Sequence, residues 1–127
     1  MSYLPYLTHL TFVNLDGTTA AATSLFTTEN AGQRFYPTAA YVTLRSVSGF
    51  VTVATISLGT NAATYTNIVA AGALTGLSAA NQYEPLTLVS GVVSSVAPNT
   101  AIFCNVSIGA VATTYKLDLD LVGFYKT

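Results

Sequence analysis

Charged side chains are scarce in this sequence. Lysine, arginine, aspartate and glutamate make up 7% of the 127 residues, against about 25% in an ordinary globular domain. With four cations, five anions and a net charge of −1, the chain cannot neutralise many phosphates, so we expect no nucleic-acid partner. The hydrophobic share of 51% provides ample material for a core, which excludes an intrinsically disordered chain.

Three other residue types are nearly or completely absent. The chain has one cysteine, one histidine and no tryptophan. A single cysteine excludes both an internal disulfide and a cysteine metal cluster. Carbohydrate-binding platforms usually combine tryptophan with tyrosine, so the eight tyrosines favour protein contacts or the rim of the core over sugar stacking.

The shortage of charge also restricts how the surface is used. A monomer of this size exposes roughly 6,400 Å², so even nine fully exposed charges would be widely spaced. Surfaces that other chains cover permanently are depleted in charge and enriched in aromatic residues. We therefore expect an obligate subunit of an assembly; the alternative is a monomer kept soluble by its hydroxyl groups.

No segment is suited to cross a membrane as a helix. Residues 46–83 contain no charge, but serine, threonine, glycine and asparagine interrupt them, so no apolar run approaches the roughly 18 residues required. The first residues, Met1–Pro5, lack the basic and apolar regions of a signal peptide. We expect a protein made in a cytoplasm, with no membrane partner.

Alternation of apolar and polar residues predicts β-strands along most of the chain. Between residues 115 and 122, three leucines alternate with a lysine and two aspartates, which places the leucines on one face of a strand. Residues 101–108 alternate in the same way. Because Gly109 and small residues separate the two segments, we predict an antiparallel hairpin.

Turn residues separate about eight predicted strands, and no segment has the period of a helix. We expect a single all-β domain over residues 1–127, a two-sheet antiparallel β-sandwich of jelly-roll type. Residues 1–16 would form an N-terminal strand or an arm that contacts other subunits, and Leu74 and Leu77 would reach the core from a loop. The other predicted strands are residues 6–13, 25–27, 34–36, 41–47, 50–58, 64–69 and 86–93, with 17–24 as a loop or an edge strand.

No set of residues predicts catalysis. His9 lies in an alternating strand, and no Gly-x-Ser-x-Gly elbow supplies it with a nucleophile. Cys104 lies on an apolar face without a basic neighbour, so we expect a buried and unreactive thiol. Glu29 and Glu84 are the only glutamates and are not paired as glycoside hydrolysis requires. We expect no enzyme activity and no cofactor.

Two aspartates are a weak candidate for a metal site. Asp118 and Asp120 stand two residues apart on one strand face, roughly 7 Å between Cα atoms, and carboxylates suit Ca²⁺. Lys116 shares that face, however, and the alternation with leucine already explains both acids as solvated side chains. We therefore expect no metal.

Several short segments carry a resemblance to a known family. They are Phe35-Tyr36-Pro37, residues 56–61 with Tyr65 and Asn67-Ile68, Leu74 with Gly76-Leu77, residues 98–100 before Ile102, Asn105 and Val106, and residues 112–114 through Leu121 to Tyr125. Taken together, residues 35–125 resemble small β-rich virion proteins of tailed bacteriophages. Residues 1–34 show no such likeness.

The resemblance implies a capsid decoration (cement) protein. Such a protein is a jelly-roll-like subunit, usually a homotrimer, on the outer surface of a virion capsid where major capsid proteins meet. Its partners would be copies of itself and the major capsid protein, and it would bridge capsomers against the pressure of the packaged DNA. A net charge near zero suits such a role, because many identical neighbours must not repel one another.

The candidate partner-binding residues lie in two segments. Free termini can extend or exchange strands between subunits, so the N-terminal segment is the first candidate. Two other functions remain open: a trimeric host-recognition module of a fibre or spike that binds cell-surface glycan, and a subunit of a cellular filament or coat. The candidate residues are Tyr3, Leu4, Pro5, Tyr6, Phe35 and Tyr36.

Overall fold

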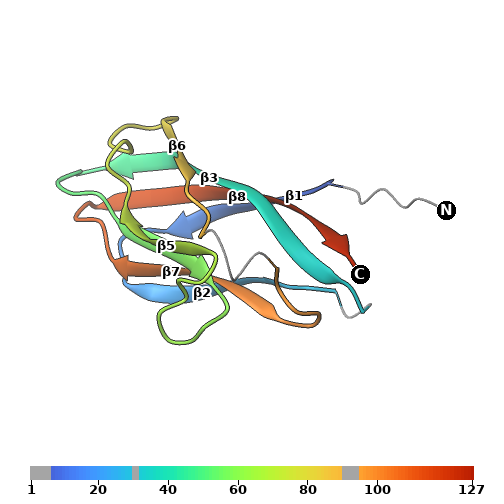
Figure 1. Cartoon of the computed structure of the whole chain (residues 1–127). Coiled ribbons are helices and arrows are strands. Elements are labelled where there is room, and N and C mark those ends of the chain that lie inside the picture. The colour runs from blue at the N-terminus through green and yellow to red at the C-terminus, as the bar shows by residue number, and fades with distance from the viewer. Residues whose placement is uncertain (1–6, 30–31, 90–94) are drawn as a thin grey trace.

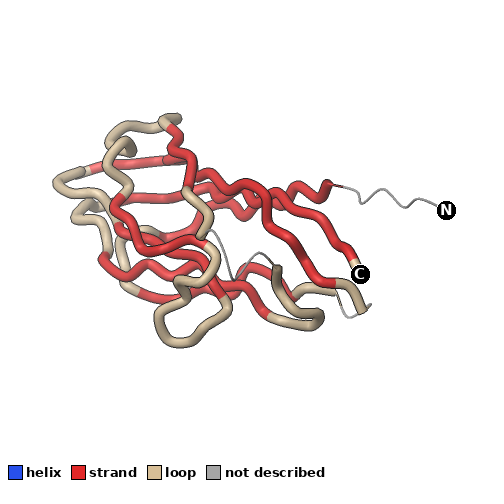
Figure 2. The backbone as a smooth tube through the Cα atoms, in the orientation of Figure 1, coloured by secondary structure: helices blue, strands red, loops and turns tan. Residues whose placement is uncertain are grey.

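The structure, a computed structural model, describes residues 7–29, 32–89 and 95–127. All regular elements in these residues are strands (Figure 2). They are β1 (Leu7–Asp16), β2 (Ala21–Thr27), β3 (Arg34–Ser48), β4 (Thr55–Gly59), β5 (Val69–Ala73), β6 (Tyr83–Leu86), β7 (Ala101–Ile108) and β8 (Thr114–Lys126).

The strands form two four-stranded antiparallel sheets, one above the other in Figure 1. The strand orders are β1-β8-β3-β6 and β2-β7-β4-β5. Folding the chain back on itself between its fourth and fifth strands pairs β1 with β8, β2 with β7, β3 with β6 and β4 with β5, and these four pairs are present. The pairs β8–β3 and β7–β4 then complete the two sheets. This is the order of an eight-stranded jelly roll, so the predicted fold class is confirmed.

The core lies between the sheets and follows the predicted alternation. Every second residue of β8 from Tyr115 to Gly123 is buried, and β7 buries three alternate side chains against it. Leu74 and Leu77 reach the core from the loop after β5 and are fully buried, as the sequence predicted. The alternating buried residues are Leu117, Leu119 and Leu121 in β8, and Ile102, Cys104 and Val106 in β7.

The predicted hairpin between residues 101–108 and 115–122 is wrong. β7 and β8 are both strands, but they belong to different sheets. The connection between them crosses from one sheet to the other, beside the connection from β1 to β2. The two connections are joined by a hydrogen bond from Ala110 N to Gly17 O of 2.7 Å. Alternation was a correct sign of one buried face, but both layers of a sandwich show it.

β3 is one long strand where the sequence predicted two, at residues 34–36 and 41–47. It is irregular at two places, between Pro37 and Ala39 and between Leu44 and Ser46, where its register with β8 shifts. A bulge lets a strand continue through a proline, which cannot donate a ladder hydrogen bond. Pro37 therefore lies inside a strand.

Two other predicted strands are shorter or displaced. Of residues 50–58, only the end belongs to β4; Val51 and Thr52 cross between the sheets and hydrogen-bond to Val111. Residues 64–68 belong to a loop, although their composition favours a strand. The Asn61 side chain accepts hydrogen bonds there from the backbone N–H groups of Thr66 (2.8 Å) and Asn67 (3.2 Å). Such hydrogen bonds from the backbone to a side chain favour a loop here over the strand that the β propensity of these residues predicts.

The remaining differences lie at the edges of the sheets. Residues 17–24 are part loop and part edge strand, because β2 begins at Ala21. β6 lies upstream of the predicted strand 86–93 and shares only Leu86 with it. Residues 90–93 of that prediction lie outside the described residues, as do residues 1–6 of the predicted N-terminal arm.

Candidate functional site

The charged residues are concentrated on one sheet. Eight of the nine belong to strands of the β1-β8-β3-β6 sheet, hereafter the charged sheet. The ninth, Glu29, follows β2. The strands of the β2-β7-β4-β5 sheet, hereafter the uncharged sheet, contain none. The eight residues are Asp16, Arg34, Arg45, Glu84, Lys116, Asp118, Asp120 and Lys126.

A polar network occupies the outer face of the charged sheet. Asp120 accepts a hydrogen bond of 2.7 Å from Thr11 Oγ1, and its Oδ1 lies 2.8 Å from His9 Nε2. Because a carboxylate only accepts, this nitrogen of His9 carries the proton in that contact. The Tyr41 hydroxyl lies 3.5 Å from the same nitrogen. None of the described hydrogen-bond partners of His9 is a serine or a cysteine.

The two aspartates considered for a metal are engaged separately. Asp118 forms an ion pair with Arg45, at 3.1 Å, and accepts a hydrogen bond of 2.9 Å from the backbone N–H of Asn14. Asp120 is held by His9 and Thr11. Within residues 7–29, 32–89 and 95–127, no group of three or more histidine, cysteine, aspartate and glutamate side chains is placed to hold a metal ion.

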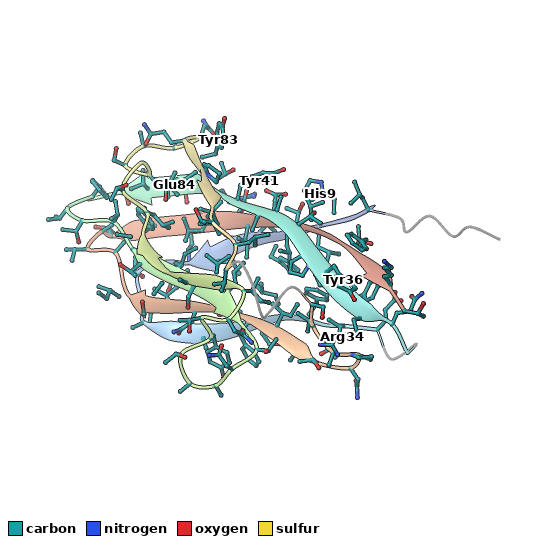
Figure 3. All side chains as sticks on the ribbon, viewed as in Figure 1. His9, Arg34, Tyr36, Tyr41, Tyr83 and Glu84 are labelled. Carbon is teal, nitrogen blue, oxygen red and sulfur yellow. The ribbon has the colours of Figure 1, made fainter. Side chains whose placement is uncertain are left out.

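An open groove of about 650 Å³ lies on the charged sheet beside the edge strand β6. Tyr41 on β3 is paired with Pro85 on β6, and Thr43 with Tyr83, so the two tyrosines are diagonal neighbours on the same face. Figure 3 shows Tyr83 and Tyr41 succeeding one another from β6 toward His9. We call this the tyrosine groove. Its lining is uncharged: Thr38, Ala39, Ala40, Tyr41, Thr43, Asn81, Tyr83, Pro85, Leu86 and Leu88.

The outer face of the uncharged sheet carries mostly small and hydroxyl-bearing residues, together with Phe103 and Asn105, and the 60–68 loop covers part of it. Tyr65 of that loop stacks on Phe103 with ring centroids 4.6 Å apart. The Thr64 carbonyl accepts hydrogen bonds of 3.2 Å from Ser57 and from Asn105. Beside the loop lies a shallow hollow lined by Ala20, Ala21, Ala63, Thr64, Thr66, Ala71, Asn105, Val106 and Ser107.

Cys104 is inaccessible to reagents and ligands. It lies in the core with 3% of its surface exposed, and this burial raises the pKa of its thiol from about 9 to about 12. A neutral buried thiol is neither a nucleophile nor a metal ligand at neutral pH. The sequence prediction of a buried thiol is therefore confirmed.

The structure separates the candidate partner-binding residues. Tyr3, Leu4, Pro5 and Tyr6 lie outside the described residues. Phe35 is fully buried and packs against Phe26 and Tyr125, with centroids 5.7 and 5.2 Å away. Its neighbour Tyr36 lies on the outer face of the charged sheet and stacks on Phe124 at 5.2 Å. Only Tyr36 of the second segment therefore has a side chain placed to meet a partner.

Tyr41 and Tyr83 were not singled out from the sequence. Tyr83 is 70% exposed, and it meets Tyr41 only because β6 pairs with β3 across about forty residues of chain. One signal was present, since Tyr83 and Pro85 alternate with Glu84 and Leu86 and would share one face of a strand. That pattern does not identify the strand with which it pairs.

Comparisons with known proteins show the fold. No family model and no curated protein matches the sequence. Three solved chains match in structure. One, from the capsid asymmetric unit of cyanophage Pam1, is 16% identical with a TM-score of 0.60, and the match covers 100% of this chain and 89% of that one. A second, from the capsid of Ralstonia phage GP4, is 18% identical with a TM-score of 0.63 and coverages of 98% and 89%. The third, from the acid-stable capsid of Helicobacter pylori bacteriophage KHP30, is 12% identical with a TM-score of 0.61 and coverages of 98% and 90%. The described residues contain no helix long and apolar enough to span a membrane. The chain thus shares its fold, over nearly its whole length, with chains found in three phage capsids.

Proposed function

We propose that this chain is a structural protein of a phage virion, a decoration (cement) subunit that bridges neighbouring capsomers on the capsid surface. The observation that carries the proposal is the separation of charge between two sheets of a fold that three phage capsid chains share. A cement subunit performs no chemistry and acts through the area that it buries against its partners. The described residues fit this role, since no described serine or cysteine hydrogen-bonds to His9 and Cys104 is buried.

The uncharged sheet is the surface that we assign to the shell. Moving a charge out of water costs several kcal/mol unless it is paired, whereas alanine, threonine and serine are covered at little cost. A partner that covers the uncharged sheet therefore leaves the charged sheet in water, where charges favour solubility. In this arrangement the major capsid protein contacts β2, β5 and β7.

The self-association that we propose is a homotrimer in which the N-terminal segment Tyr3–Tyr6 contacts a neighbouring copy. The segment enters the described structure at Leu7, which is 71% exposed and paired with Phe124. Tyr36 stacks on that same phenylalanine. Leu7, Phe124 and Tyr36 thus form a row of apolar side chains across the charged sheet, and the N-terminal segment starts at one end of this row.

Capsid attachment of two charge variants tests the proposal. Ala71→Asp places a charge on the exposed face of β5, and Val13→Asp places the same charge on the exposed edge of the charged sheet. Each purified variant is mixed with capsids of the phage that lack this chain, and bound protein is measured after sedimentation. We expect Ala71→Asp to lose at least tenfold in affinity and Val13→Asp to bind as the unchanged protein does.

Two results would contradict the proposal in different ways. If the unchanged protein does not sediment with the capsids, decoration is wrong. If Val13→Asp loses attachment and Ala71→Asp keeps it, the assignment of the uncharged sheet is wrong while decoration stands. Folding of each variant is checked by its melting temperature, because both positions are exposed and should tolerate a carboxylate.

A second candidate function is host recognition through cell-surface glycan. The observation that favours it is the combination of Tyr41, Tyr83 and Asn81 in the tyrosine groove, because tyrosine rings stack on sugars and amides hydrogen-bond to their hydroxyl groups. Immunogold labelling of virions distinguishes the two functions. Label over the whole capsid supports decoration, and label at a fibre or spike supports host recognition.

A further inference from the structure

The tyrosine groove is a hollow in the described surface that the function proposed above does not use. It lies at the edge of the charged sheet, and most of its lining comes from β3 and β6, whereas the surface that we assign to the capsid is on β2, β5 and β7. Its volume of about 650 Å³ is within the range of sites that bind a small ligand or a short peptide. In a subunit that associates with other copies of itself, we expect such a groove to bind a ligand or a segment of another chain.

We propose that the tyrosine groove binds the N-terminal segment, residues 1–6, of a neighbouring copy of this chain. The inference rests on the self-association part of the proposed function. The groove presents two tyrosine rings and a proline over a floor of alanine and leucine side chains. Aromatic-lined grooves of this composition bind extended, proline-containing segments, because such segments lose little conformational entropy on binding. The segment Met-Ser-Tyr-Leu-Pro-Tyr is of that type.

The charge of the two surfaces also matches. None of the ten residues that line the groove carries a charge, and none of the side chains in residues 1–6 does. Glu84 is the nearest charged residue along β6, but its carboxylate accepts a hydrogen bond of 2.9 Å from Gly76 N and does not line the groove. An uncharged segment therefore buries no unpaired charge when it enters the groove.

The direction of β1 explains why the segment of a neighbour fits better than the segment of the same chain. Leu7 pairs with Phe124, whereas Tyr41 of the groove lies level with Asp120 and Thr11. The groove therefore lies four residues further along β1 and two strands across, roughly 16 Å from Leu7. Traced backward from Thr11 to Leu7, β1 leads away from the groove. Six residues span at most about 20 Å, so a segment that first had to reverse direction would use most of its length to arrive at Tyr41 and would leave little to fill the groove.

Peptide binding tests the proposal on a chain that lacks residues 2–6 and so leaves its grooves unoccupied. The probe is a fluorescein-labelled peptide of residues 1–6, measured by fluorescence anisotropy. We expect saturable binding that weakens at least tenfold with Tyr83→Ala in the groove. Tyr65→Ala, on the far sheet, is the matched control and should leave binding unchanged. A peptide in which both tyrosines and the leucine are replaced by serine should not bind.

Each outcome bears on the proposal. Absence of binding, or equal binding to the Tyr83→Ala variant, overturns it, and so does displacement of the peptide by a neutral oligosaccharide that itself binds more tightly. If the shortened chain does not fold, full-length protein with Tyr3→Ser and Tyr6→Ser replaces it in the same measurement. Because no capsid is present, a failure here leaves decoration standing, and a failure of capsid attachment leaves the groove assignment standing.

Discussion

The hydroxyl of Tyr115 donates a hydrogen bond of 2.7 Å to the backbone carbonyl of Leu77. Tyr115 lies in β8 and is fully buried, while Leu77 lies in the loop between β5 and β6. The bond therefore fastens this loop, which leads into the tyrosine groove, to a central strand of the charged sheet.

Replacing this tyrosine tests how much the bond contributes. Tyr115→Phe leaves the Leu77 carbonyl buried without a partner, so we expect the free energy of unfolding to fall by about 1–3 kcal/mol. Urea denaturation followed by circular dichroism measures the change. Tyr83→Phe, which removes a hydroxyl from an exposed ring, is the control and should change stability by less than about 0.5 kcal/mol. If the two substitutions lower the free energy of unfolding equally, the hydrogen bond to the Leu77 carbonyl does not contribute the stability that we expect.

The crossing of two connections at Gly109 leads to a second prediction. A Cβ at this residue would overlap the backbone carbonyl of Thr18. We expect Gly109→Ala to destabilise the fold by about 1–3 kcal/mol, since the backbone must shift to admit the methyl group.

Gly72 provides the control for that substitution. A Cβ there comes no closer than 3.9 Å to any heavy atom beyond its two chain neighbours, the nearest being the Ala70 carbonyl oxygen, so Gly72→Ala should leave the urea midpoint unchanged or raise it slightly. A Gly109→Ala variant as stable as Gly72→Ala would show that the crossing of the two connections is not tight.

The turn at Asn61 leads to a third prediction. Asn61→Ala removes the side-chain oxygen that accepts hydrogen bonds from Thr66 and Asn67, and we expect a loss of about 1–2 kcal/mol. Asn61→Asp keeps an acceptor at the same place and should retain most of the stability. If aspartate destabilises as much as alanine, the acceptor oxygen is not what holds the turn. Thermal unfolding of the three proteins at one pH gives the comparison.

Cys104 makes stability depend on alkaline pH. Its thiol ionises near pH 9 in the unfolded chain, and its folded pKa is about 12 because of burial. Below pH 9 both states keep the proton. Above pH 9 only the unfolded state loses it, so the free energy of unfolding falls as pH rises, by up to about 1.4 kcal/mol per pH unit until the folded pKa is reached.

Removing the thiol should remove this contribution. Cys104→Ala leaves a cavity and lowers stability at every pH, but its stability should fall less steeply between pH 9 and pH 10 than that of the unchanged protein. Urea midpoints at half-unit pH intervals measure the slope. Parallel curves for the two proteins would contradict the assignment of this dependence to Cys104.

Sequence patterns predicted the strands better than their partners. The bounds of β7 match residues 101–108, and the alternating leucines of β8 are buried as expected, because burial on one face produces a period of two wherever a strand lies. The same period does not identify the sheet to which a strand belongs, which is why the hairpin prediction failed. Residue propensity also fails to predict a turn that a side-chain acceptor stabilises, such as the turn held by the Asn61 side chain.

The candidate site was predicted less well for the same reason. The shortage of charge was visible in the composition, but the concentration of eight of the nine charged residues on one sheet follows from the strand order β1-β8-β3-β6. Phe35 was a candidate for partner contact, and the alternation within β3 turns it into the core instead. The tyrosine groove depends on the pairing of β3 with β6, which no local pattern specifies.

The pairing of the first strand with the last has a consequence for how this protein is made. β1 lies at the edge of its sheet, and among the described residues β8 is the strand that pairs with it. During synthesis, β8 leaves the ribosome only after residues 17–113 have followed β1 out of it. β1 thus has no partner while those residues are translated, so this sheet closes only after β8 has emerged, with slow folding and a hazard of strand exchange between nascent chains.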